Sequence, residues 1–125
     1  MGLSQQEIDE KLKKCQDEFA AVWATGSAEK LADLYHPHAV MVHAGHKSIY
    51  GRENIIATFK EFIASPSDFS VVADQNLEAG DGLYLIQKGR FVLSKDGKNE
   101  EFPYEQIFKR EPDGSYLIYH DEFHL

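Results

Sequence analysis

Residues 83–110, with the sequence LYLIQKGRFVLSKDGKNEEFPYEQIFKR, decide the fold of this chain. Apolar and polar side chains alternate in two runs, and the dipeptide Asp96-Gly97 between them favours the tight turn of a β-hairpin. The alternation therefore predicts two long antiparallel strands, over residues 83–94 and 101–110.

Further turn signals extend this hairpin at both ends. Gly80-Asp81-Gly82 precedes it and Pro112-Asp113-Gly114 follows it, so we expect additional strands over residues 69–77 and 116–123. Long strands joined by tight turns predict an antiparallel meander. A further short strand is expected at residues 39–43.

The N-terminal half of the chain has the pattern of helices. Ser4 and Glu7 form a capping box, and apolar residues then recur at steps of three and four until Gly26. Ser27 begins a short second helix, and residues 52–64 form a third after a loop. Because helices precede the long strands, the order predicts an α+β fold, with one domain spanning the 125 residues.

The composition limits the classes of function. The chain has 13 lysine and arginine residues against 21 aspartate and glutamate residues, giving a formal net charge of −8. This balance argues against binding to nucleic acids or anionic membranes, which require clustered basic side chains. The sequence shows no signal peptide, no membrane-spanning apolar run and only one cysteine, so a cytoplasmic protein is expected.

Alternation also predicts which side chains point into the fold. Gln87, Tyr104 and Gln106 share the inner faces of the two central strands with large apolar residues. Buried polar groups need partners, so these residues form either a satisfied core network or part of a pocket lining. Trp23 and Phe59, on the first and third helices, either line an aromatic pocket that stacks a flat ligand or belong to the core.

The last strand has mixed faces. Parity places Tyr119 and Asp121 inward, although a shift of one residue would bring His120 and Glu122 inward instead. Tyr35, at the end of the second helix, is a further aromatic candidate for the pocket.

His43 is the candidate general base. It ends the short strand whose other pocket-side member is Met41, and Asp121 or Tyr119 could orient it. An imidazole titrates near neutral pH, which suits proton abstraction or activation of water. The alternative is a strand-end histidine that is hydrogen-bonded or exposed.

No cofactor is expected. His36, His38, His43 and His46 lie close together in the sequence, but no cysteine pair or His-Glu-x-x-His motif accompanies them, so we expect no metal site. Gly80-Asp81-Gly82 lacks the spacing of a phosphate-binding loop.

The outer sheet face is expected to mediate a homodimer. A sheet face with a continuous apolar band is rarely left exposed to water, so a second copy of the chain is expected to cover it. Its members, interleaved with charged residues, are Tyr84, Ile86, Val92, Ile107, Tyr116 and Ile118.

Three segments together resemble the SnoaL-like branch of the nuclear transport factor 2-like superfamily. They are residues 19–40 (FAAVWATGSAEKLADLYHPHAV), residues 50–55 (YGRENI) and residues 113–118 (DGSYLI). The resemblance implies a cone-shaped, curved antiparallel β-sheet wrapped around three N-terminal helices, enclosing a pocket, and implies dimerisation. It does not fix the function, because the superfamily includes isomerases, cyclases, hydrolases, ligand binders and association domains.

The chemistry of the ketosteroid isomerases in this superfamily is not inherited. That reaction needs a carboxylate base on the first strand, a tyrosine on the first helix and a protonated aspartic acid on the penultimate strand. The resemblance places these roles at His43, Phe19 and Gln106, none of which keeps the required residue.

Two functions therefore remain. The first is a binding domain for a small apolar or aromatic ligand, with a possible enzymatic role for His43. The second is a non-catalytic dimerisation or association module, in which side chains would fill the pocket.

Overall fold

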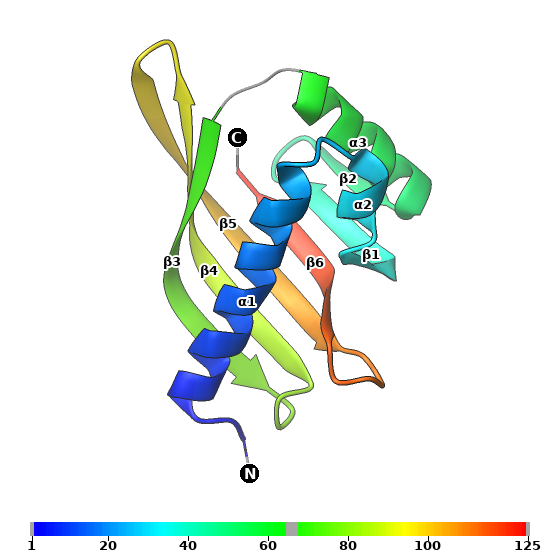
Figure 1. Ribbon diagram of the computed structural model, residues 1–125, viewed down its shortest axis with the longest axis vertical. Helices are drawn as coiled ribbons and strands as arrows, with labels where there is room; N and C mark the ends of the chain where they lie inside the picture. Colours follow the sequence, from blue (N-terminus) through cyan, green and yellow to red (C-terminus); the bar gives the residue numbers. More distant parts are fainter. Residues whose placement is uncertain (1, 65–67, 125) are drawn as a thin grey trace.

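The computed structural model describes residues 2–64 and 68–124, and its element order confirms the α+β fold (Figure 1). Helices α1 (Gln5–Trp23) and α2 (Ala28–Ala32) come first, and α3 (Arg52–Ala64) follows two strands. The predicted capping box begins α1: the Ser4 hydroxyl accepts from the Glu7 amide, and the Glu7 carboxylate accepts from the Ser4 amide.

Six strands form one curved, unclosed sheet in the order β2-β1-β6-β5-β4-β3. Strands β3 to β6 form the predicted meander, with antiparallel pairing throughout. The exception to an antiparallel sheet is β1, which pairs with β6 in parallel. The strands are β1 (Tyr35–His43), β2 (Lys47–Tyr50), β3 (Asp68–Ala79), β4 (Tyr84–Lys95), β5 (Lys98–Arg110) and β6 (Tyr116–Phe123).

The region around β1 differs from the sequence prediction in two ways. β1 begins at Tyr35, before the expected start, and its pairing with β6 is irregular between Tyr35 and Val40, where Pro37 has no amide hydrogen to donate. The segment expected as a loop contains β2, whose Ile49 pairs with Met41 and is buried in the core. β2 is short and has few apolar residues, so the sequence pattern did not predict it.

The helices cover one face of the sheet. α1 packs across β3 and β4, while α3 packs against β1 and β2, as Figure 1 shows. The largest fully buried side chains join these layers: Leu12, Leu31, Met41, Ile55 and Leu85. Among the described residues, no helix is long and apolar enough to cross a membrane.

A bulge in β6 changes which of its side chains face inward. On β5, Ile107 pairs with His120 and Phe108 pairs with Ile118, so Tyr119 is the extra residue. Asp121 lies inward beyond the bulge. Side-chain parity is therefore different on the two sides of Tyr119.

The bulge overturns two predictions. Tyr119 does not face the interior: Lys109 Nζ lies 5.3 Å above its ring, and the His36 ring meets it edge-on at 5.2 Å. Tyr116 and Ile118 do not join the outer apolar band, because both pack against the core beneath α1. Strict alternation does not hold along a strand that contains one extra residue.

Candidate functional site

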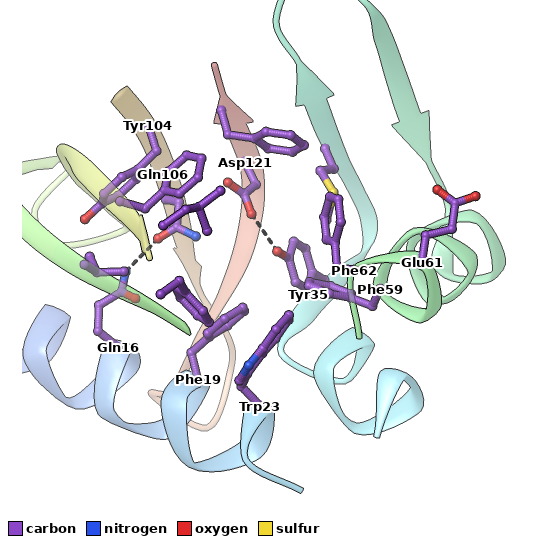
Figure 2. Close-up of a pocket in the computed structure, with 16 residues that line it drawn as sticks. Gln16, Phe19, Trp23, Tyr35, Phe59, Glu61, Phe62, Tyr104, Gln106 and Asp121 are labelled. Atoms are coloured by element: carbon purple, nitrogen blue, oxygen red, sulfur yellow. Dashed lines mark hydrogen bonds between the residues drawn. The ribbon is translucent and has the colours of Figure 1, made fainter. Parts of the chain in front are cut away.

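A pocket of about 370 Å³ lies between the helices and the concave face of the sheet (Figure 2). Its wall combines residues of α1, α3 and five strands. Most of these residues are aromatic or aliphatic: Phe19, Trp23, Tyr35, Met41, Phe59, Phe62, Phe69, Val71, Phe91, Leu93, Tyr104 and Phe123. The polar lining residues are Gln16, Glu61, Gln106 and Asp121.

Rings from three elements pack against one another in the wall. Trp23 of α1 meets Phe69 of β3 edge-on, with ring centroids 5.0 Å apart, and meets Phe59 of α3 at 6.3 Å. Phe19 lies one helical turn before Trp23 and contacts the same two phenylalanines. Such edge-to-face contacts hold the rings in fixed orientations and give the pocket a defined apolar surface.

Asp121 is the acidic group inside the pocket. Its side chain is 8% exposed, and its Oδ2 accepts a 2.6 Å hydrogen bond from the Tyr35 hydroxyl (Figure 2). Gln106 lies directly opposite it on β5. Tyr35 and Gln106 both reach Asp121 because β6 lies between β1 and β5. Each of these neighbouring strands contributes one partner.

Burial raises the pKa of the Asp121 carboxyl, because the charged form loses its hydration. Hydrogen bonds from Tyr35 and Gln106, together with the nearby charge of His120, lower this pKa and offset part of the rise. Burial also raises the pKa of Tyr35, and the Asp121 carboxylate raises it further. Tyr35 is therefore a neutral hydrogen-bond donor at physiological pH.

A network of amides continues from Gln106 toward the surface. Gln16 Nε2 on α1 donates to the side-chain oxygens of Gln106, at 2.6 Å, and Gln87, at 2.8 Å. The Tyr104 hydroxyl donates to the same Gln87 oxygen, and Gln87 Nε2 donates to the side chain of Asn76 on β3. The network ties α1 to three strands and satisfies the buried amides.

This network settles the place of Gln87. Its side chain points inward as predicted and is 2% exposed, but it does not line the pocket. The Tyr104 hydroxyl and the Gln16 side-chain amide both donate to its oxygen. Gln87 thus belongs to the satisfied core network, while Gln106 and Tyr104 take part in both network and pocket.

His43 does not line the pocket. It lies at the end of β1, where its ring stacks on Phe123 at 5.0 Å and the tilted ring of His46 lies 4.2 Å away. Burial of the ring, with His46 and Lys47 nearby, lowers its pKa. The expected pair of His43 and Asp121 is not formed, because His43 lies opposite Phe123 on β6, two residues beyond Asp121, and the carboxylate bonds to Tyr35.

Most other predicted site residues do meet at the pocket. Trp23, Tyr35, Met41, Phe59, Tyr104, Gln106 and Asp121 all line it, whereas His43, Gln87 and Tyr119 do not. Gln16 was not among the predicted site residues, although it occurs four residues after Leu12 on the apolar face of α1. A polar residue at that step was a signal for an inward-facing amide. Phe91 and Leu93, which share the predicted inner face of β4, were also not among the predicted site residues.

The histidines do not gather into a metal site. His36 Nδ1 accepts from the His38 backbone amide, which holds the two rings 5.6 Å apart. Within residues 2–64 and 68–124, no group of three or more histidine, cysteine or acidic side chains is placed to hold a metal ion.

Comparisons with known proteins agree on the fold. The family described as the SnoaL-like domain matches residues 17–117. None of the curated proteins matches the sequence.

Solved structures with low sequence identity share the architecture. An NTF-2 like protein of unknown function from Shewanella oneidensis MR-1 has a TM-score of 0.78 at 12% identity, over 94% of this chain and 98% of that one. A Catenulispora acidiphila protein in complex with S-DNPA has a TM-score of 0.76 at 18% identity, over 96% and 94%.

A third similar structure, from Xanthomonas campestris, is described as a calcium/calmodulin dependent protein kinase II association domain. Its TM-score is 0.73 at 23% identity, and the match covers 90% of this chain and 84% of that chain. At such identities the likeness establishes the fold alone.

Proposed function

The chain belongs to the SnoaL-like domain family of the nuclear transport factor 2-like superfamily, and on this premise we propose that it binds a small, largely apolar molecule in the pocket. The polar end of the ligand lies at Asp121 and Tyr35. Its apolar body lies among the rings of Trp23, Phe59 and their neighbours, which offer flat surfaces for stacking.

One observation carries this proposal: a buried carboxyl group, that of Asp121, lies in the wall of an aromatic pocket and has no cationic partner among the described residues there. Burying a carboxyl costs free energy unless it is paired, and such groups concentrate at functional sites. Asp121 has only neutral hydrogen-bonding partners in Tyr35 and Gln106. A core that served packing alone would be more stable with an apolar residue at this position.

Asp121 also replaces His43 as the candidate for proton transfer. A carboxyl whose pKa lies closer to neutrality gives or accepts a proton more readily at physiological pH. The neighbouring Tyr35 hydroxyl would donate a hydrogen bond to an oxygen that gains negative charge. The pocket thus has the parts of an acid–base site, and binding is its first requirement.

The binding proposal is tested with the single tryptophan. Trp23 lines the pocket, so its indole Nε1–H gives one resonance in an NMR spectrum that reports on pocket occupancy. We expect naphthylmethanol, a neutral molecule with two fused rings, to shift this resonance and to release heat in a calorimetric titration. Filling the pocket by Met41→Trp should weaken both responses, with a second indole resonance appearing in that variant.

Two results would contradict the proposal. The first is an unchanged Trp23 resonance at saturating naphthylmethanol. The second is equal binding by the protein and by the pocket-filling variant, which would place the ligand elsewhere on the surface.

A second candidate function is an association module that acts through the outer face of the sheet. Tyr84, Ile86, Val92 and Ile107 are partly exposed on this face, which no described helix covers. The similarity to the Xanthomonas campestris association domain is consistent with this use of the fold. The open pocket differs from the filled one expected of a module that only associates, so dimerisation through this face would accompany ligand binding and not replace it.

A further inference from the structure

We propose that the pocket selects ligands that carry a positive charge, namely aromatic or apolar amines, and that the Asp121 carboxylate is their counter-ion. This inference rests on the proposed binding function and adds the chemical class of the ligand. It follows from the charges and the rings that line the pocket.

The first observation is the charge of the lining. Asp121 is more than nine-tenths buried and points into the pocket, yet its hydrogen-bonding partners, Tyr35 and Gln106, are neutral. Among the described residues, no lysine, arginine or histidine lines the pocket. A carboxylate in such a site gains most from a ligand that brings the missing positive charge.

The same lining opposes anionic ligands. A carboxylate or phosphate would find no cation to pair with and would lie against Asp121. The net charge of −8 acts in the same direction at long range, since it attracts cations and repels anions.

The second observation is the aromatic wall. Tyr35 and Phe59 are in contact, with ring centroids 5.7 Å apart, and Trp23 adjoins Phe59. Because its hydroxyl bonds to Asp121, Tyr35 also places an aromatic ring next to the carboxylate. Aromatic faces attract ammonium groups, most strongly when water is excluded, so rings and carboxylate favour the same charge.

Other titratable groups around Asp121 do not supply a competing cation inside the pocket. Tyr35 faces it from β1, whereas the Tyr104 hydroxyl on β5 donates to Gln87, and burial raises the pKa of both phenols. His120, the preceding residue on β6, influences the carboxyl without lining the pocket. Glu61 of α3 is exposed and points away from Asp121 in Figure 2.

Three ligands that share one ring system test the inference. Naphthylmethylamine is cationic near neutral pH, naphthylmethanol is neutral and naphthoate is anionic. Calorimetric titrations of the same protein should give a dissociation constant for the amine about tenfold lower than that for the alcohol. Naphthoate should bind more weakly than either.

A matched pair of variants identifies the counter-ion. Asp121→Asn keeps the size of the side chain and its hydrogen bond from Tyr35 but removes the charge. Glu122→Gln removes one charge from the next residue, which points to the opposite face of the sheet. We expect the first variant to lose the preference for the amine and the second to keep it.

The pH dependence gives an independent measurement. The amine should bind more tightly as pH rises through the pKa of Asp121 and reach a plateau above it, because the ion pair needs the ionised carboxyl. In Asp121→Asn this rise should disappear. A His120→Asn variant should retain it, which separates the carboxyl from the neighbouring imidazole.

The outcomes distinguish the two proposals. Tighter binding of the amine that disappears in Asp121→Asn supports the inference. If the amine binds no more tightly than naphthylmethanol, the inference about charge is overturned. The proposed pocket function still stands as long as naphthylmethanol binds. A preference that persists in Asp121→Asn also overturns it, and failure of both ligands to bind overturns the pocket function as well.

Discussion

The hydroxyl of Tyr35 donates a 2.6 Å hydrogen bond to the carboxylate of Asp121, joining β1 to β6 inside the wall of the pocket. Both residues are largely buried, so the bond lies in surroundings of low dielectric, where it is stronger than in water. The pair therefore links the stability of the sheet to the ionisation of its acidic group.

Removing the donor should change both properties. Tyr35→Phe leaves the Asp121 carboxyl without its tyrosine partner, which should lower the free energy of unfolding by about 1–3 kcal/mol. The pKa of Asp121 should rise further, because the lost bond stabilised the charged form. Urea denaturation and carboxyl NMR titration measure these two effects.

Tyr50→Phe is the control for this substitution. The side chain of Tyr50 is 59% exposed, so its variant should change stability by less than about 0.5 kcal/mol. Equal losses in the two variants would mean that the bond to Asp121 contributes nothing.

Asp121 should make stability depend on pH in a particular direction. An aspartate in an unfolded chain has a pKa of about 3.9, and burial raises the pKa of Asp121 in the folded protein. Between these values the folded state binds more protons, so the contribution of Asp121 to the free energy of unfolding falls as pH rises. Above the folded pKa this contribution no longer changes.

Asp121→Asn should remove this particular loss. Between the unfolded and folded pKa values of Asp121, the free energy of unfolding of the variant should rise with pH relative to that of the unmodified protein. Above the folded pKa the difference between the two proteins should stay constant. Urea titrations at a series of pH values from about 4 upward test this expectation. Parallel stability curves for the two proteins would exclude a raised pKa for Asp121.

The amide network predicts a specific role for Gln16. Gln16→Ala removes the donor shared by the oxygens of Gln87 and Gln106, and should lower the free energy of unfolding by about 1–3 kcal/mol. Gln6→Ala, on the exposed side of the same helix, should have a much smaller effect. Chemical denaturation of both variants measures the difference, and similar losses would refute a structural role for the network.

Gly89 allows the close approach of neighbouring groups. A Cβ at this position would lie 2.2 Å from the Val72 carbonyl oxygen and 3.0 Å from the Tyr104 hydroxyl oxygen. Gly89→Ala should therefore destabilise the fold by about 1–3 kcal/mol through overpacking. A thermal unfolding midpoint equal to that of the unmodified protein would show that β3 moves away without cost.

The outer face provides the test of self-association. If a homodimer forms there, Ile107→Lys should shift the sedimentation profile toward the monomer, because a charge would be buried in the interface. Ala57→Lys, on the exposed side of α3, should leave the profile unchanged. A protein that sediments as a monomer before any substitution would contradict the proposed dimer.

Regular elements were predictable from the sequence because local patterns determine them. The alternation in β4 and β5 has no interruption, so the inward positions of Gln87, Tyr104 and Gln106 were correctly predicted. The capping box of α1 likewise depends on residues only three positions apart. The resemblance to the superfamily added the expectation of a curved sheet wrapped around the helices and enclosing a pocket.

The details of the site depend on long-range structure and were harder to predict. The bulge at Tyr119 arises from pairing with β5, and no glycine or proline marks it in the sequence. The partner of Asp121 is a residue of β1, so the Tyr35 bond required the parallel pairing of these two strands. His43 ends a strand at the expected place, but its stacking on Phe123 could not be read from local sequence.

The position of β6 in the sheet determines when the sheet and the pocket wall can be completed during synthesis of the protein. β6 follows every other strand in the sequence, yet it lies between β1 and β5. Until residues 116–123 have left the ribosome, the strands belong to two separate pieces, β2-β1 and β5-β4-β3, and each piece has an unpaired edge. A nascent chain that pauses before this segment lacks both Asp121 and the strand that joins the two pieces. The pocket therefore acquires its carboxyl group and its complete wall in the same late step of synthesis.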